Sequence, residues 1–157
     1  MSSLNSNYII LKEQNLLVEC HSGNLDLESY INFVTSTTLD PLFSANMNYF
    51  IDLSNVIVTA SIDDIRKYNN FTEATFISEK KRKVALVTNS PNQMVFATLF
   101  KNSNTQKLKE IEVFSTTTAA MHWLNNNLIK YEILDVLIAL KNPIEYQLQK
   151  NSKKNSQ

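Results

Sequence analysis

The chain has 157 residues, of which 43% are hydrophobic and 19% are charged, so its size and composition are those of one globular domain. Its 15 basic and 15 acidic residues cancel, and we therefore expect no nucleic-acid partner, because such partners bind basic surfaces. A single glycine, Gly23, excludes the Walker loop, the dinucleotide fingerprint and the nucleophile elbow, each of which needs several closely spaced glycines.

The first third of the chain predicts a hairpin, a helix and a further strand. Short apolar runs at 8–12 and 16–21 flank a three-residue turn and are typical of paired strands. Asp26 then precedes apolar residues at helical spacing and is expected to cap a helix that ends before Pro41. The apolar run at 48–54 predicts the next strand.

The middle of the chain predicts a second helix and a buried strand. Ser61 begins a helix that runs to about Ser78, with Ile62 expected on its inner face. The charged segment 79–83 is interpreted as a polar connector that follows this helix. The continuously apolar run 84–88 predicts a central parallel strand that is covered on both faces.

A third helix, a fifth strand and a fourth helix follow. Ser90 is a helix cap, followed by Pro91 in the first turn. The residues expected to line the inner face of this helix are Met94, Val95, Leu99 and Phe100. Segment 110–114 alternates as a strand, and Ser115 is expected to open the fourth helix.

The resulting order is β-β-α-β-α-β-α-β-α, which predicts an α/β fold with a single mixed, mainly parallel five-stranded sheet. The opening hairpin supplies the one antiparallel strand. We interpret residues 1–128 as one domain, 129–150 as a C-terminal helical extension, and the polar segment 151–157 as a disordered tail.

Several short motifs resemble the SpoIIAA-like branch of the sulfate-transporter and anti-sigma-factor-antagonist (STAS) fold, also called STAS/SEC14. This sequence and that branch have three features in common. The first is an apolar loop before a strand that ends in Asp, and the second is an apolar strand that ends in Ser-Pro. The third is a closing pattern in which Val-Phe is followed by Ala and then by Trp-Leu. These residues are Asp40, Pro41, Phe43, Met47, Phe50, Ile51, Asp52, Ser90, Pro91, Val113, Phe114, Ala120, Trp123 and Leu124. The resemblance implies a non-catalytic regulatory module that binds a protein partner, or alternatively a SEC14-like binder of a small apolar ligand or lipid.

The resemblance also marks one candidate modification site. Counting on from Asp52, the serine that is phosphorylated in the antagonists falls on Ser61. The neighbours differ from the antagonist pattern, because Ala60, Ile62 and Asp63 stand where aspartate, serine and glycine are usual. Phosphate at this position would repel the aspartates beside it.

The residues alone favour a structural role for Ser61. Its hydroxyl can accept a hydrogen bond from the first turn of the helix, and Asp64 can reach back to the cap as a short capping-box partner. Both the cap and the phosphorylated switch remain open at this stage.

Apolar residues in the connection before the third strand have two alternative interpretations. They pack as ordinary core, or they form the mouth of a pocket for an apolar ligand together with the third helix. The candidate lining residues are Leu42, Phe43, Met47, Met94 and Phe96.

An aliphatic stripe in the C-terminal extension must also be covered. It consists of Ile129, Ile133, Val136, Leu137 and Leu140. Burying five such side chains is worth on the order of 8–15 kcal/mol before entropy is subtracted. The stripe therefore packs against its own domain or against a second copy in a homodimer.

No residue pattern indicates catalysis, a cofactor or a metal. Cys20 and His21 are adjacent on a strand, so their side chains point to opposite faces, and His122 lies far along the chain. Asp52 is interpreted as capping a turn at a strand end, although a carboxylate site there is conceivable. We therefore expect no enzyme.

The sequence also predicts where in the cell the protein is found. A single cysteine and a polar N-terminus without a secretory pattern predict a cytoplasmic protein. No apolar run approaches the ~18 residues that stable membrane insertion requires. The Asn- and Lys-rich, Gly-poor usage fits an AT-rich bacterial genome.

Overall fold

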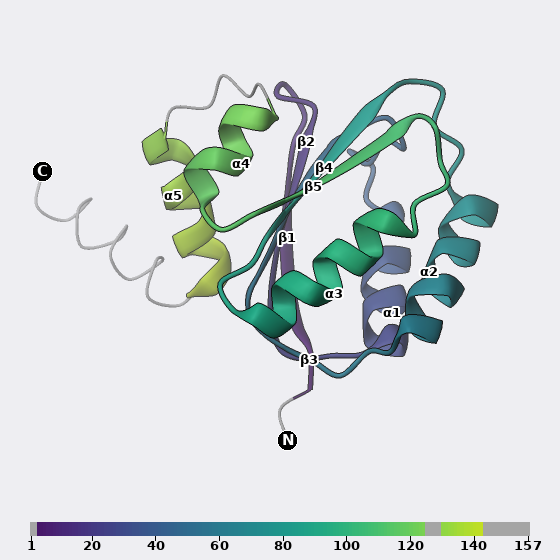
Figure 1. Cartoon of the computed structure of the whole chain (residues 1–157). Helices are drawn as coiled ribbons and strands as arrows, with labels where there is room; N and C mark the ends of the chain where they lie inside the picture. The colour runs from purple at the N-terminus through teal and green to yellow at the C-terminus, as the bar shows by residue number, and fades with distance from the viewer. Residues whose placement is uncertain (1–2, 125–129, 143–157) are drawn as a thin grey trace, which may run out of the picture.

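The computed structural model describes residues 3–124 and 130–142, and Figure 1 shows a central sheet with helices on both faces. The strands lie in the order β1-β2-β3-β4-β5. Their bounds are β1 Asn5–Leu11, β2 Leu16–Leu25, β3 Asn48–Val58, β4 Arg82–Val87 and β5 Lys109–Phe114. β1 pairs antiparallel with β2, and every other neighbouring pair is parallel. The predicted α/β class and the single mixed sheet are confirmed.

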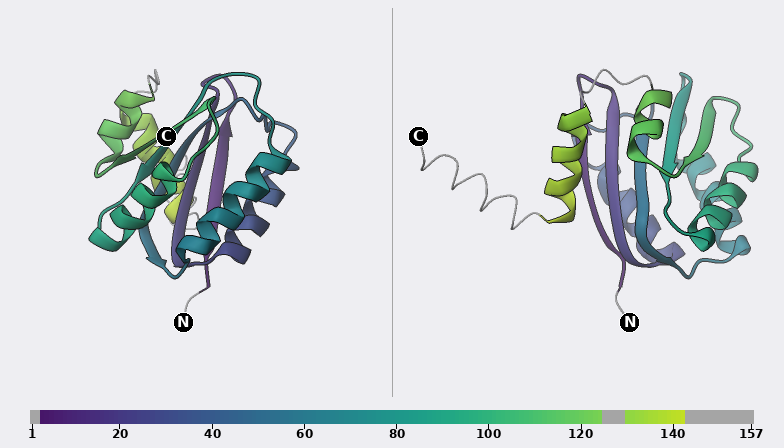
Figure 2. Two further views of the ribbon diagram at one scale, coloured as in Figure 1. Left: turned by 45° about the vertical axis from the view of Figure 1, so that its right-hand side comes forward. Right: turned by 60° about the vertical axis from the view of Figure 1, so that its left-hand side comes forward.

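Two groups of helices cover the two faces of the sheet (Figures 1 and 2). The helices are α1 Leu27–Thr38, α2 Ile62–Thr75, α3 Pro91–Asn102, α4 Thr117–Trp123 and α5 Lys130–Lys141. Successive parallel strands are added in one direction, so right-handed crossovers put α1, α2 and α3 on the same face. α4 and α5 lie on the opposite face, which we call the α5 face; the other is the α1 face.

Alternation along the strands, interrupted by one irregularity in the pairing of β2 and β3, supplies a core to each face. The core of the α5 face contains Leu16, Val18, Cys20, Phe50, Ala85 and Val87, together with residues of α4 and α5. The core of the α1 face contains Leu25, Ile51, Leu53, Val56, Val84, Leu86, Ala97 and Ile111. Because both faces of β4 are covered, its sequence is continuously apolar from residue 84 to its end at residue 87, in agreement with the predicted buried strand.

Polar residues begin the helices and turn the hairpin. Asp26, Ser61 and Ser90 cap α1, α2 and α3 as predicted. The cap of α4 is Thr116 and not Ser115. Asn15 turns the first hairpin with a φ of 50°, a left-handed conformation that Asn tolerates better than most residues.

The inner face of α3 differs from the prediction. Met94 and Val95 are 52% and 60% exposed, while Gln93 and Ala97 are buried. Gln93 was not expected on the inner face, because an apolar pattern does not reveal a buried polar side chain. Its Nε2 donates to the Ser54 and Val56 carbonyls, and its Oε1 accepts from the Asn89 amide, so it joins α3 to the end of β3.

The expected polar connector at 79–83 is also only partly correct. Arg82 and Lys83 belong to β4, and Arg82 is buried. Lys83 is placed by Trp123, because its Nζ donates to the Trp123 carbonyl at 2.8 Å and lies 5.0 Å from the centre of the indole ring. The aromatic and carbonyl partners explain how these cations enter a strand.

The described part of the aliphatic stripe packs against its own domain, which is the first of the two alternatives. Leu137 is buried in the core of the α5 face, and Val136 and Leu140 pack against that core. Ile129 and the side chain of Ile133 lie outside the described residues, as do residues 143–150 of the extension and the tail at 151–157. Among the helices that are described, none is long and apolar enough to span a membrane.

Candidate functional site

The carboxyl ends of β2 and β3 meet the first turns of α1 and α2 on the α1 face, where parallel sheets commonly bind ligands. Ser61 lies here and is exposed. Its Oγ accepts from the Asp64 amide at 3.2 Å, and Asp64 Oδ2 accepts from the Ser61 amide at 2.8 Å. The predicted capping box is therefore confirmed.

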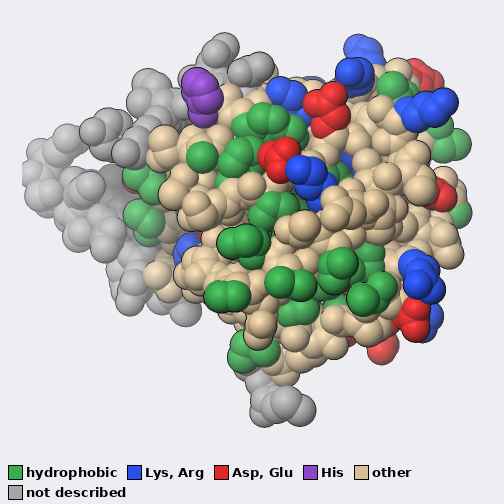
Figure 3. All heavy atoms as spheres, viewed as in Figure 1, with side chains coloured by type: hydrophobic (Ala, Val, Ile, Leu, Met, Phe, Trp, Pro, Cys, Tyr) green, Lys and Arg blue, Asp and Glu red, His purple; other side chains and the backbone are tan. Residues whose placement is uncertain are grey.

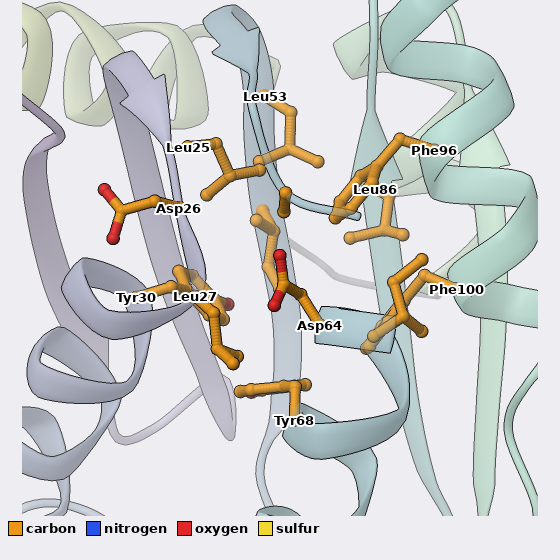
Figure 4. A pocket seen from close by; sticks show the side chains of 13 residues that line it. Leu25, Asp26, Leu27, Tyr30, Leu53, Asp64, Tyr68, Leu86, Phe96 and Phe100 are labelled. Atoms are coloured by element: carbon orange, nitrogen blue, oxygen red, sulfur yellow. The ribbon is translucent and has the colours of Figure 1, made fainter. Parts of the chain in front are cut away.

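An apolar cavity of about 60 Å³ lies behind these helix ends. Figure 4 shows Asp64 pointing toward it from α2, the Asp26 carboxylate turned away from it at the start of α1, and Phe96 and Phe100 on the α3 side. Hydrogen bonds from the Ser29 amide and hydroxyl lower the pKa of Asp26, and the Ser61 amide lowers the pKa of Asp64. Both carboxylates are thus occupied as helix caps at the rim, and the interior is hydrocarbon and aromatic.

A second cavity of about 40 Å³ lies deeper under α1 and α2 and is charged. Tyr30 and Tyr68 line both cavities, with ring centres 5.3 Å apart. Glu19, Arg82 and Lys109, all buried, line the second. Burial first, and then the neighbouring Arg82, lowers the pKa of Lys109 from 10.5 to about 8. Arg82 Nε has no hydrogen-bond partner among the described atoms.

Sequence reasoning missed a hydrogen-bonded group that contains His21. Glu19 Oε2 lies 2.9 Å from His21 Nε2 and accepts from the Tyr30 hydroxyl at 3.0 Å, and His21 Nδ1 lies 2.7 Å from Ser6 Oγ. Only the neighbour Cys20 had been considered as a partner of His21. Glu19 and His21 are two apart and share a strand face, which is the signal that could have revealed the pair.

The other reactive side chains have structural partners. Cys20 lies in the core of the α5 face, where burial and then the nearby Asp52 raise its pKa to about 12. Asp52 lies within β3 and not at a strand end, so the predicted turn is wrong. It accepts from the Ser54 amide and hydroxyl where the pairing of β2 and β3 is irregular, and it pairs with Lys141 Nζ at 3.0 Å. His122 is exposed on α4. No group of three metal-ligating side chains occurs within the described ranges.

The five residues considered for an apolar pocket are not brought together. Phe96 lines the apolar cavity, whereas Met47 is buried core, and Leu42 and Met94 are exposed. Phe43 packs on Phe76 with ring centres 6.0 Å apart. The described residues thus place this loop partly in the core and partly in solvent.

Comparisons with known proteins identify the fold. No protein-family model and no curated protein matches the chain. A solved structure does match: an uncharacterized protein of the DUF3478 family from Shewanella loihica, which has a SpoIIAA-like fold. The match has a TM-score of 0.51 and 16% identity, and it covers 79% of this chain and 98% of that one. The chain has the SpoIIAA-like fold. The SpoIIAA-like fold implied by the sequence resemblance is confirmed.

This SpoIIAA-like chain also presents exposed apolar side chains beside the site. We call them the α3 patch, and they are Ile62 at the start of α2 and Met94, Val95 and Leu99 on α3. Figure 3 shows hydrophobic side chains gathered over α3. Ile62 was predicted to face inward, but it is the first residue of α2 and is 57% exposed. Clustered exposed hydrophobic side chains are typical of interaction surfaces.

Proposed function

We propose that this SpoIIAA-like chain is a non-catalytic interaction module that binds a protein partner through the α3 patch. The observation that carries the proposal is the exposure of Ile62 at the start of α2 and of Met94 and Val95 on α3. Partner binding that removes these side chains from water contributes about 25 cal/mol for each Å² of apolar surface buried.

The small cavities argue against the lipid-binding alternative. Pockets that enclose small molecules usually have volumes of ~300–1,000 Å³. The apolar cavity measures about 60 Å³ and the charged cavity about 40 Å³. A lipid chain would have to displace Tyr30 and Tyr68, whose rings line both spaces. We therefore favour a partner that covers the surface.

Ser61 gives the module a possible point of regulation. It is exposed at the border of the α3 patch, and its hydroxyl is held only by the Asp64 amide. A phosphate there would disrupt the capping box and repel Asp63 and Asp64, so it would change the same surface. Intact-mass measurement of protein from its native cells, across growth conditions, tests this prediction; a consistent absence of phosphate would remove it.

Site-specific photocrosslinking in the native cells tests the proposed surface. A photoreactive residue at Val95 should give a discrete adduct with another protein. The matched control is Ile138, which is 48% exposed on α5 and lies on the opposite face of the sheet. Equal adducts at both positions, or no adduct at Val95, would contradict the proposal.

A further inference from the structure

Ser6, His21 and Glu19 form a continuous hydrogen-bonded series on the α1 face of β1 and β2. Ser6 Oγ lies 2.7 Å from His21 Nδ1, and His21 Nε2 lies 2.9 Å from Glu19 Oε2. The antiparallel register places Ser6 directly opposite His21. Glu19 precedes His21 by two residues and therefore shares its face. The backbone thus fixes the order hydroxyl, imidazole, carboxylate.

The hydrogen bonds define where the protons lie. Glu19 lies within hydrogen-bond distance of His21 Nε2 and accepts from the Tyr30 hydroxyl, and burial followed by the proximity of Glu19 raises the pKa of Tyr30, which keeps that hydroxyl a donor. When Glu19 is a carboxylate, which only accepts, and His21 is neutral, Nε2 of His21 carries the ring proton. The lone pair of Nδ1 then faces the Ser6 hydroxyl, which donates to it.

The imidazole is also held in orientation and kept away from water. Its ring stands edge-on to Phe33 and Tyr30, with centres 5.0 and 5.3 Å away. His21 is 2% exposed and Glu19 is 1% exposed, whereas Ser6 lies on an edge strand and is half-buried. Of the three residues, Ser6 is thus the one that is partly open to solvent. A buried base oriented by a carboxylate, with an accessible hydroxyl, is the arrangement that activates a serine nucleophile.

We propose that Ser6 is a histidine-activated nucleophile that accepts an acyl group from a small activated ester or thioester. Ser6 Oγ attacks the acyl carbonyl while its proton moves to Nδ1 of His21, and Glu19 stabilises the resulting imidazolium. The bond from the acyl carbon to the leaving oxygen or sulfur then breaks, and the leaving group takes the proton from Nδ1. The net result is an ester on Ser6 and a free alcohol or thiol.

The surroundings of Ser6 define the substrate class. Neither cavity is lined by Ser6, so a substrate would approach from solvent and would not be enclosed. Without enclosure, the donor must supply its own reactivity through a good leaving group, which favours aryl esters and thioesters over amides. The site uses none of the α3 patch residues, so its test is independent of the proposed interaction function.

Acetylation by p-nitrophenyl acetate tests the proposal with the full chain. We expect one acetyl group at Ser6, located by peptide mapping, with release of one equivalent of nitrophenolate. His21→Gln should slow acetylation of Ser6 about 100-fold, the lower range for a general base. Glu19→Gln should slow it less, because an amide oxygen can still accept from Nε2.

The controls separate reactivity from folding. Ser6→Ala removes only a hydroxyl from an edge strand and should keep the circular dichroism spectrum and melting temperature while losing this adduct. Ser90, whose hydroxyl accepts from the Gln93 amide with no histidine recorded beside it, should remain unmodified in the same digest. Acetylation absent from Ser6, or unchanged in a folded His21→Gln variant, would overturn the proposal.

Discussion

The two faces of the sheet share the same five strands but differ in what covers them. On the α5 face, Phe50 is completely buried among aliphatic residues, and the one ionic contact described there joins Asp52 to Lys141. The α1 face holds both cavities, the buried Glu19 and His21, and the exposed α3 patch beside it.

This difference indicates that one face mainly stabilises the fold and the other carries the function. A dry, filled face contributes stability, because every void or unpaired polar group would cost free energy. A face with voids, buried charges and exposed apolar side chains is less stable than it could be, and such departures commonly accompany function. Each prediction below alters one face and asks whether the other face behaves differently.

The largest effect should come from emptying the centre of the α5 face. Phe50→Ala should lower the free energy of unfolding by about 3–5 kcal/mol, the range for a buried aromatic side chain. Phe100→Ala, on the α1 face, should cost less, about 2 kcal/mol, because Phe100 is already half-buried beside two cavities. Urea unfolding of both variants measures the comparison. An equal or larger loss for Phe100→Ala would show that the α1 face is as tightly packed.

Removing a buried charge from the α1 face should raise the free energy of unfolding, whereas removing an aromatic side chain lowers it. The pKa of Lys109 is about 8 in the folded chain and 10.5 when it is not perturbed, so between these values the unfolded chain binds more protons. The free energy of unfolding therefore rises with pH across this window. Lys109→Met should stabilise the protein at pH 7 by about 3 kcal/mol and abolish its share of that rise.

Other groups also titrate at high pH, so the contribution of Lys109 must be separated from theirs by comparing variants. Burial raises the pKa values of Cys20 and Tyr49 to about 12, so the folded chain holds these protons longer and stability falls as pH rises above about 9. The difference between the parent and Lys109→Met, measured by urea unfolding from pH 7 to 10.5, isolates the lysine. A difference that does not change with pH would contradict its assigned role.

A smaller effect should come from the cap of α2. Ser61→Ala removes the acceptor for the Asp64 amide and should cost about 1 kcal/mol of unfolding free energy. Ser61→Asn retains a capping side chain and should cost much less. Thermal unfolding of the two variants checks this. Equal melting temperatures for the parent and Ser61→Ala would mean that the hydroxyl is not needed as a cap.

The smallest effect should come from the ionic contact on the α5 face. Lys141 is partly exposed, so Lys141→Met should cost under about 1 kcal/mol. Asp52 keeps its two hydrogen bonds from Ser54 in this variant. Hydrogen exchange should nevertheless quicken in α5, whose ion pair with β3 is lost. Unchanged exchange in α5 would show that aliphatic packing and the hydrogen bond from Asn7 Nδ2 to the Leu140 carbonyl hold the helix without the ion pair.

The fold was predictable because its signals are local and repeated. Helix caps such as Asp26 and Ser61 precede apolar residues at helical spacing, and the run 84–87 is continuously apolar because both of its faces are covered. Periodicity and caps together define the element order, and the crossover rule then defines the layers. The errors in α3 and at Arg82 occurred where a polar residue is buried against partners distant in the sequence.

The candidate site was predictable only in part. Ser61 could be placed because its capping partner is three residues away. The Ser6, His21 and Glu19 series depends on strand register, which joins residues 15 apart and is not visible in a pattern of polarity. The α3 patch was misjudged for a related reason, since the rotation of α3 depends on Gln93 bonding to β3.

The affinity of the partner recovered by crosslinking at Val95 tests the division between the two faces most directly. Val95→Lys places a charge in the α3 patch, and Ile138→Lys places the same charge at an exposed position on α5. We predict that Val95→Lys weakens binding at least about tenfold, or 1.4 kcal/mol, while Ile138→Lys leaves it unchanged. Equal affinities for the two variants would contradict the proposed interaction surface.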